Sequence, residues 1–307
     1  MTGKIAITPR SLSGAGHAAL SLLTDRGYEI VFPAPGKTPS EDDLLRAVPG
    51  CVGWLAGVEP ISPRVLAAAK GLRVISRNGT GVDNINLAEA AAQGIAVERA
   101  IGANARGVAE LAITLMLAAF RQVPWSDGHL RRGDWQRRIG FEAQGRTLAV
   151  IGCGAIGREV ADLALGLGMW VVGYDPFPSN AFARPGFRFA PLQEALTVAD
   201  AVSFHCPPGA RPLLDGDTIA AMRRGVTVIN TARAELIDEA AMLAALDSGQ
   251  VAALATDVFL KEPPDLSPLL THDRVILTPH AGGFTEESVE RATIVAIENL
   301  LRVLEKR

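Results

Sequence analysis

Short apolar runs alternate along nearly the whole chain with stretches in which apolar residues recur at helical spacing. The runs predict strands buried on both faces, and the spaced stretches predict helices. This alternation is typical of the α/β class, in which parallel sheets carry helices on both faces. The strands that we expect are Lys4–Ile7, Glu29–Phe32, Val52–Leu55, Arg73–Ser76, Ile95–Val97, Thr147–Ile151, Trp170–Tyr174, Ala201–His205, Val226–Asn230, Val251–Thr256 and Val275–Thr278.

These strands form two groups, which a long predicted helix, Arg106–Arg121, separates. The first group has the size of a flavodoxin-like unit. The last predicted helix, Glu286–Leu304, precedes no strand, so we expect it to dock on the first domain. The predicted organisation is two doubly wound domains: residues 1–100 plus 284–307 form the substrate domain, and a Rossmann-type domain of residues 101–283 is inserted into it.

A glycine-rich segment follows the expected strand that ends at Ile151 and opens an expected helix. Glycines at this spacing permit a tight turn, a close approach to a pyrophosphate and packing of helix on strand, while free N–H groups at the helix start face the phosphates. An acid about twenty residues later can hold a ribose hydroxyl. The alternative is a tight turn without ligand. The predicted nucleotide contacts are Gly152, Gly154, Ala155, Ile156, Gly157 and Asp175.

Further polar residues follow other strands of the second domain, and ligands of such sheets bind beyond the carboxyl ends of the strands. His280 can move a proton during hydride transfer to or from a carbon that bears oxygen. Glu262, in a turn with two prolines, can orient the imidazole, and Arg233 offers a planar cation for a carboxylate. Each has a structural alternative: a capping histidine, a solvated turn residue and a surface arginine. Asp257 could cap a loop, and His205 could be structural.

Five motifs together resemble the D-isomer-specific 2-hydroxyacid dehydrogenases, and most of all their phosphoglycerate dehydrogenase branch. They occur in the family's order over nearly the whole chain. The motifs are residues 77–84, 152–157, 230–233, 257–264 and 278–280.

The resemblance implies an NAD-dependent enzyme that interconverts a D-2-hydroxy acid and its 2-keto acid. It assigns the acid/base role to His280, its pairing to Glu262 and substrate binding to Arg233. Asp175 favours NAD because its charge repels the 2′-phosphate of NADP. Further cofactor contacts implied are His205, Pro207, Thr231 and Asp257. The substrate loop implied is Arg77, Asn78, Gly79, Thr80 and Gly81. The resemblance implies that backbone N–H groups of residues 78–81 close over the substrate carboxylate, which Arg233 also binds, and that Arg77 lies near a phosphate.

The best single substrate is 3-phosphoglycerate. The alternatives are a hydroxypyruvate or glyoxylate reductase, a dehydrogenase of another anionic acid and, more remotely, an NAD(H)-sensing binding protein. A homodimer built around residues 106–138 is also implied. Gly107 replaces the usual serine, Ala234–Glu235 replaces two frequent glycines, and the segment after Pro207 is about two residues short. Because the chain ends at Arg307, we expect no serine-sensing domain and no feedback through one.

Composition excludes several classes of function. A net charge of -3 argues against nucleic acid as a partner, and we expect Arg131–Arg132 and Arg137–Arg138 to form a solvated helical face rather than an anion patch. The three cysteines lack metal-ligand spacing, so we expect no metal, no disulfide framework and a cytoplasmic location. The apolar run Val108–Phe120 is too short to span a bilayer, and we expect no membrane role.

Overall fold

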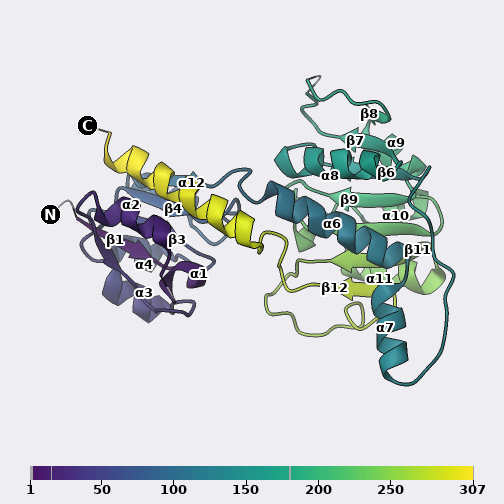
Figure 1. Cartoon of the computed structure of the whole chain (residues 1–307), viewed down its shortest axis with the longest axis horizontal. Helices are drawn as coiled ribbons and strands as arrows, with labels where there is room; N and C mark the ends of the chain where they lie inside the picture. Colours follow the sequence, from purple (N-terminus) through teal and green to yellow (C-terminus); the bar gives the residue numbers. More distant parts are fainter. Residues whose placement is uncertain (1–2, 15, 180, 307) are drawn as a thin grey trace. The chain divides into compact units, whose positions relative to one another are not determined.

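The computed structural model describes residues 3–14, 16–179 and 181–306, and the chain divides into two compact units (Figure 1). Unit 1 contains the residues up to Asn104 and those from Gly283 on, and unit 2 is Ala105–Gly282. The boundaries expected from the sequence placed residues 101–104 and Gly283 with the second domain. They belong to unit 1 because Arg291 Nε donates to the Ala103 carbonyl at 2.9 Å and Asn104 packs against Gly283.

Unit 1 is built on a five-stranded parallel sheet of order β2-β1-β3-β4-β5. Its strands are β1 (Lys4–Ile7), β2 (Glu29–Val31), β3 (Cys51–Ala56), β4 (Val74–Arg77) and β5 (Ala96–Arg99). Its helical segments are α1 (Arg10–Ser13), η1 (Ala18–Leu20), α2 (Ser21–Thr24), α3 (Glu41–Ala47), α4 (Pro63–Ala68), α5 (Leu87–Ala92) and α12 (Glu286–Leu304).

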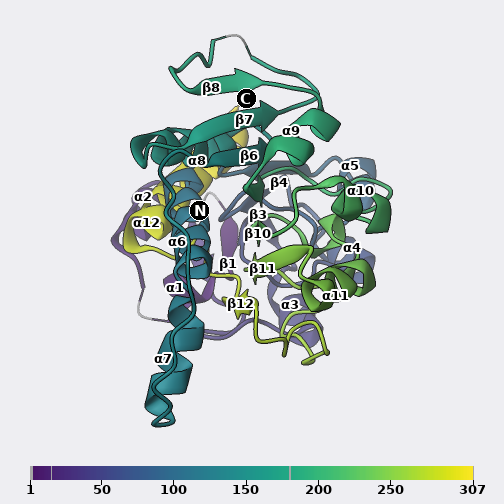
Figure 2. The ribbon, with the colours of Figure 1, turned by 90° about the vertical axis from the view of Figure 1, so that its right-hand side faces the viewer.

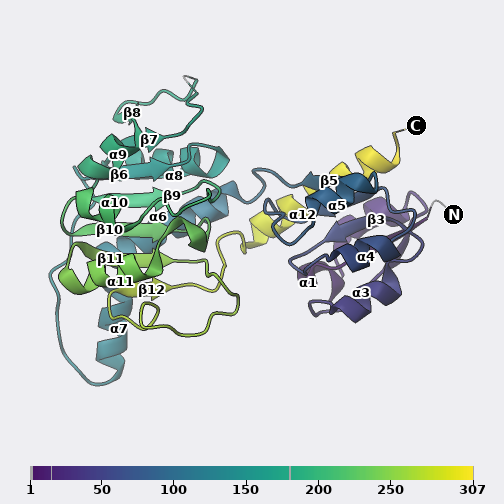
Figure 3. The ribbon, with the colours of Figure 1, turned by 180° about the vertical axis from the view of Figure 1, so that it is seen from behind.

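Alternate residues of β1, β3, β4 and β5 enter two separate cores, as the two-residue period of a strand requires. In β1, Ile5 and Ile7 pack under α2 and α12, whereas Ala6 joins the core beneath α3, α4 and α5. Figure 3 shows α4 and α5 on the face of the sheet opposite to α12. The sheet of unit 1 is therefore buried on both sides.

The last helix, α12, lies close against the sheet of unit 1. Thr285 caps its start by accepting from the Ser288 N–H, and Ser76 donates to the Ala296 carbonyl at 2.7 Å. A Cβ on Gly53 would lie 3.2 Å from the Leu304 side chain, so the glycine permits this approach. The apolar stripe of the helix thereby completes the first core.

Unit 2 carries a seven-stranded sheet of order β12-β11-β10-β9-β6-β7-β8, in which every pair is parallel. Its strands are β6 (Thr147–Ile151), β7 (Trp170–Tyr174), β8 (Phe187–Phe189), β9 (Ala201–Phe204), β10 (Val226–Asn230), β11 (Val251–Thr256) and β12 (Val275–Leu277). Its helical segments are α6 (Ala105–Phe120), α7 (Val123–Arg131), α8 (Ala155–Gly166), α9 (Leu192–Val198), α10 (Gly216–Ala221), η2 (Ala234–Leu236) and α11 (Glu239–Ser248).

The sheet of unit 2 lies between two helical layers, with α6 and α8 on one face and α9, α10 and α11 on the other (Figure 2). The strand order reverses at β6, whose neighbours are β7 and β9. Such a reversal opens a crevice at the carboxyl ends of the strands. The predicted class, α/β with two doubly wound parallel sheets, is confirmed.

Helix α7 and the segment after it differ from expectation. The helix ends at Arg131, and Arg137 and Arg138 lie in a segment without helical structure, so the predicted helical face is wrong there. The Arg138 guanidinium lies 3.9 Å from the centre of the Trp125 ring. Among the described helices none alone is long and apolar enough to cross a membrane; α6 and α7 pass that test only as a pair bent by 61°.

Candidate active site

The glycine turn after β6 is tight at two positions and open at the third. Gly152 has φ +96°, and a Cβ there would lie 2.6 Å from the His205 carbonyl oxygen. A Cβ on Gly157 would lie 1.9 Å from the Gly152 carbonyl oxygen, whereas a Cβ on Gly154 would meet no atom within 4 Å. Only glycine fits the tight positions, and the open one leaves backbone accessible to a phosphate.

Helix α8 begins at this turn. Gly154 is its N-cap and provides no side-chain acceptor, so the first N–H groups of a 12-residue helix have no cap from that side chain. These groups and the helix dipole favour an anion. The turn therefore fits the pyrophosphate of a dinucleotide, as the sequence predicts.

Asp175 lies at the end of β7, next to the turn. One carboxylate oxygen accepts from the Cys153 N–H and the other from the Phe177 N–H, both at 2.9 Å. The carboxylate is thus fixed beside the place where the ribose of a dinucleotide lies in this fold. Its negative charge disfavours a 2′-phosphate, which fits NAD better than NADP.

Two buried polar atoms at neighbouring strand ends have no hydrogen-bond partner among the described residues. They are Nδ1 of His205, after β9, and Oγ1 of Thr231, after β10. The other ring nitrogen of His205 lies 2.8 Å from the Ser203 hydroxyl, and burial lowers the pKa of His205 to about 3. Orphaned buried polar atoms are rare. Their positions fit contacts with the ribose or nicotinamide part of a cofactor.

The low pKa of His205 predicts an acid-sensitive stability. The unfolded chain binds a proton near pH 6.5 and the folded protein only near pH 3, so the free energy of unfolding falls as pH decreases between these values. His205→Gln removes this titration, and we expect a shallower pH dependence in denaturant unfolding. Equal slopes for the two proteins would contradict a buried neutral imidazole.

His280 and Glu262 form a direct pair at the carboxyl edge of the sheet. Nδ1 of His280 lies 2.8 Å from Glu262 Oε2 and 2.9 Å from Oε1. Oε1 also accepts from the Phe259 N–H at 3.2 Å, which holds the carboxylate in place. Because Glu262 engages Nδ1, the half-exposed ring keeps Nε2 for a substrate. His280 has φ +51°, a strained backbone conformation that is common at functional sites.

Arg233 follows β10, and the buried Asn230 fixes its backbone. The Asn230 amide donates to the Arg233 carbonyl at 2.8 Å and accepts from the Ala232 N–H at 3.1 Å. The Arg233 guanidinium is half-buried and donates to the Ala232 carbonyl at 2.6 Å. The next residues form η2, and Glu235 is exposed there. Arg233 and His280 thus lie on one edge of the sheet, at the ends of β10 and β12.

Asp257 serves mainly as an anchor for the His280 segment. It is 1% exposed, and its oxygens accept from the Thr278 hydroxyl at 2.5 Å, the Ala281 N–H at 2.8 Å and the Gly282 N–H at 2.9 Å. The sequence grouped Asp257 with the cofactor contacts. Its observed partners are protein groups on both sides of His280, so the direct contact with a cofactor stays a prediction.

The predicted substrate loop belongs to unit 1, whereas the residues described so far belong to unit 2. Gly79 has φ +148°, and its carbonyl accepts from the Ala100 N–H at 3.0 Å. Thr80 donates to the Ala100 carbonyl at 3.4 Å. Arg77 Nη1 donates to the Asn78 carbonyl at 2.5 Å, so this arginine braces the loop itself.

Sequence reasoning missed a buried carboxyl group in unit 1. Glu59, after β3, is 1% exposed, contacts the Thr8 hydroxyl and accepts from the Gly57 N–H at 3.1 Å. Burial raises the pKa of this carboxyl group. The available signal was an acid four residues after the end of an expected apolar strand, Val52–Leu55.

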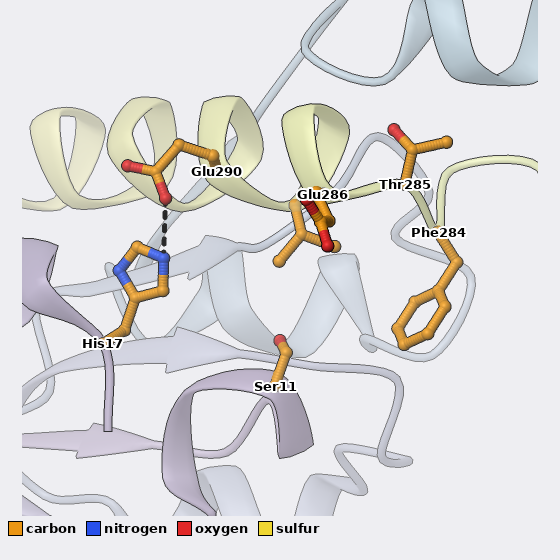
Figure 4. Close-up of a pocket in the computed structure, with 7 residues that line it drawn as sticks. Ser11, His17, Phe284, Thr285, Glu286 and Glu290 are labelled. Carbon is orange, nitrogen blue, oxygen red and sulfur yellow. Dashed lines mark ion pairs between the residues drawn. The ribbon is translucent and has the colours of Figure 1, made fainter. Parts of the chain in front are cut away.

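Unit 1 also has a cavity of about 340 Å³ between α1 and the start of α12 (Figure 4). Inside it, His17 Nε2 lies 2.8 Å from Glu290 Oε2. No predicted site residue lines the cavity, and it gives no sign of the chemistry predicted above. Its lining residues are Ser11, His17, Phe284, Thr285, Glu286, Val289 and Glu290. Throughout the described part of the chain, no group of three or more potential ligands is placed to hold a metal ion.

Comparison with known proteins links this geometry to one family. Residues 113–282 match the family model for the D-isomer specific 2-hydroxyacid dehydrogenase, NAD binding domain. D-3-phosphoglycerate dehydrogenase of Homo sapiens is 37% identical over 276 residues, 88% of this chain and 51% of that protein. The enzyme of that name from Methanocaldococcus jannaschii is 42% identical over 246 residues, 78% of this chain and 47% of that protein. The chain thus spans about half the length of these relatives.

Solved structures agree with this match over the whole chain. A protein from Thermus thermophilus has a TM-score of 0.88 and 35% identity, with 99% of this chain and 97% of that one covered. A glyoxylate reductase from Paecilomyes thermophila has a TM-score of 0.85 and 29% identity, with 100% and 97% covered.

Proposed function

Because the chain belongs to the D-isomer-specific 2-hydroxyacid dehydrogenases, we propose that it transfers a hydride between NAD and C2 of a small acid, interconverting a D-2-hydroxy acid and its 2-keto acid. The observation that carries this proposal is the His280–Glu262 pair on the same sheet edge as Arg233 and the glycine turn. The glycine turn, Asp175, His205 and Thr231 would hold the cofactor. NAD supplies the hydride acceptor or donor when it is bound.

Three residues of unit 2 have the remaining catalytic roles. In the direction of reduction, His280 donates a proton from Nε2 to the substrate oxygen. Glu262 keeps the ring in place and offsets the charge of the imidazolium. Arg233 binds the carboxylate and stabilises the negative charge that develops on the oxygen.

Glu262→Gln tests the pairing. The amide keeps the size of the side chain but cannot offset an imidazolium, and a hydrogen bond to a charged group contributes about 1.5–3 kcal/mol. We therefore expect kcat for reduction to fall at least about tenfold. Asp265→Asn, which alters an exposed carboxylate that pairs with Lys261, is the matched control and should leave kcat unchanged. Wild-type kcat in Glu262→Gln would rule out a catalytic role for the pairing.

The best single substrate is phosphohydroxypyruvate, with 3-phosphoglycerate as its reduced partner, and the relatives at 37% and 42% identity support it. The glyoxylate reductase structure supports the second candidate, reduction of glyoxylate or hydroxypyruvate. Rates of NADH consumption with phosphohydroxypyruvate, glyoxylate, hydroxypyruvate, pyruvate and oxaloacetate distinguish the two candidate substrates. Tight NADH binding without turnover of any acid would favour the remaining alternative, an NAD(H)-sensing protein.

We also propose a homodimer built around residues 106–138. Exposed apolar side chains support it, since Leu130 is 57%, Trp135 80% and Ile139 97% exposed. The double variant Trp135→Asp, Ile139→Asp should sediment as a monomer if this surface is the interface. A cytoplasmic location is supported by the three cysteines, all of which are free thiols, and cell fractionation would test it.

A further inference from the structure

The loop after β1 presents an arginine that has no partner among the described residues. Arg10 is the first residue of α1 and is exposed. Within residues 3–14, 16–179 and 181–306, its guanidinium forms no hydrogen bond, ion pair or ring contact. Arg77, the cation that the sequence pointed to, instead donates to the carbonyl of its own loop. Arg10 is thus available to bind an anion.

The loop that carries Arg10 is held firmly. Trp54 Nε1 donates to the Thr8 hydroxyl at 3.0 Å, and that hydroxyl contacts the buried carboxyl group of Glu59. A Cβ on Gly57 would lie 3.2 Å from Pro9 Cα, so the backbones of the two loops touch. Three buried side chains and one glycine therefore fix the backbone directly before Arg10.

Sheet order places this loop near the predicted substrate loop. The parallel strands run β1-β3-β4, so the loops after β1 and β4 lie on the same edge, two strands apart. Two strand spacings amount to about 10 Å. A three-carbon acid that bears a phosphate, with its carboxylate at residues 78–81, covers much of this distance, and the long side chain of Arg10 can cover the rest.

We propose that Arg10 is a specificity-determining residue that binds the second anion of the substrate, the group at the far end from the carboxylate. The proposal rests on the function proposed above. In this proposal Arg77 has a different role: it holds the substrate loop in place, which affects the binding of every 2-keto acid equally. Arg10 would serve only acids with a phosphate, carboxylate or sulfonate at the far end.

The test compares kcat/KM for phosphohydroxypyruvate and hydroxypyruvate, which differ only in the phosphate. A charge-assisted hydrogen bond corresponds to a factor of about ten to one hundred. We expect Arg10→Gln to lower kcat/KM for phosphohydroxypyruvate by that factor and to leave hydroxypyruvate unchanged. Arg10→Lys should restore part of the loss, because it keeps the charge. Arg77→Gln should lower both values together. Oxaloacetate and sulfopyruvate, assayed alongside, show whether a carboxylate or sulfonate is accepted instead of phosphate.

The outcomes distinguish a failure of the role proposed for Arg10 from a failure of the proposed function. An unchanged ratio of the two kcat/KM values in Arg10→Gln, for a protein that binds NADH like wild type, overturns the role of Arg10 and leaves the proposed function intact. A wild-type preference for hydroxypyruvate over phosphohydroxypyruvate, oxaloacetate and sulfopyruvate alike overturns it as well. If the wild-type protein turns over none of the acids, the proposed function is contradicted, and the role of Arg10 is contradicted with it.

Discussion

Replacement of His280 by alanine is expected to lower kcat for 2-keto acid reduction by about 10²–10⁴-fold while NADH binding remains. The imidazole is held by a carboxylate at the carboxyl edge of the sheet, and an imidazole can exchange a proton at neutral pH. Apart from Asp257, which anchors the His280 segment, the residues predicted to bind the cofactor lie after β6, β7, β9 and β10. Steady-state kinetics and NADH fluorescence measure the two quantities separately.

His272→Ala is the matched control, because His272 lies in the same unit, 3.5 Å from Asp247, and has no place in the site. We expect near wild-type kcat for it. Turnover in His280→Ala within a few fold of wild type would remove His280 from the acid/base role. Loss of NADH binding in the same variant would mean that its effect is structural.

Substitutions of three glycines should separate folding from cofactor binding. In Gly157→Ala the new methyl group would lie 1.9 Å from a backbone oxygen of Gly152, which cannot move aside cheaply. We expect a loss of unfolding free energy of about 3 kcal/mol and loss of NADH binding. Thermal unfolding and NADH titration measure the two effects.

Gly154 and Gly166 both have open space around them. Only Gly154 lies at the predicted phosphate site, so comparing the two tests whether the turn binds phosphate. Gly154→Ala meets no atom within 4 Å, and we expect normal stability but weaker NADH binding, because the methyl group occupies space meant for phosphate. Gly166→Ala, in the same helix and equally open, should bind NADH normally and gain up to about 1 kcal/mol. Equal NADH affinity in Gly154→Ala and Gly166→Ala would contradict a phosphate-binding site at Gly154.

The sequence predicts most of the strands because both faces of each sheet are buried, which leaves short continuous apolar runs. The bounds of β6, β7, β10 and β11 agree with those expected. Strand β8 was not predicted: it has only three residues, Phe187–Phe189, at the edge of the sheet, so the apolar signal is weak.

The site was predictable where motif spacing fixes the backbone geometry. It was less predictable where side-chain contacts determine which groups a residue binds. The tight and open glycines of residues 152–157 follow from their spacing. The hydrogen bond of Arg77 to its own loop, the enclosure of Glu59 and the backbone partners of Asp257 depend on tertiary contacts that no local pattern encodes. The availability of the Arg10 guanidinium likewise emerges only once its neighbours are known.

The configuration of the glycerate that the purified protein forms from hydroxypyruvate and NADH is the sharpest test of D-2-hydroxyacid oxidoreduction. We expect NADH to be consumed, the product to be D-glycerate and His280→Ala to form almost none. Formation of L-glycerate, or NADH binding without any product from the panel of 2-keto acids, would contradict this activity.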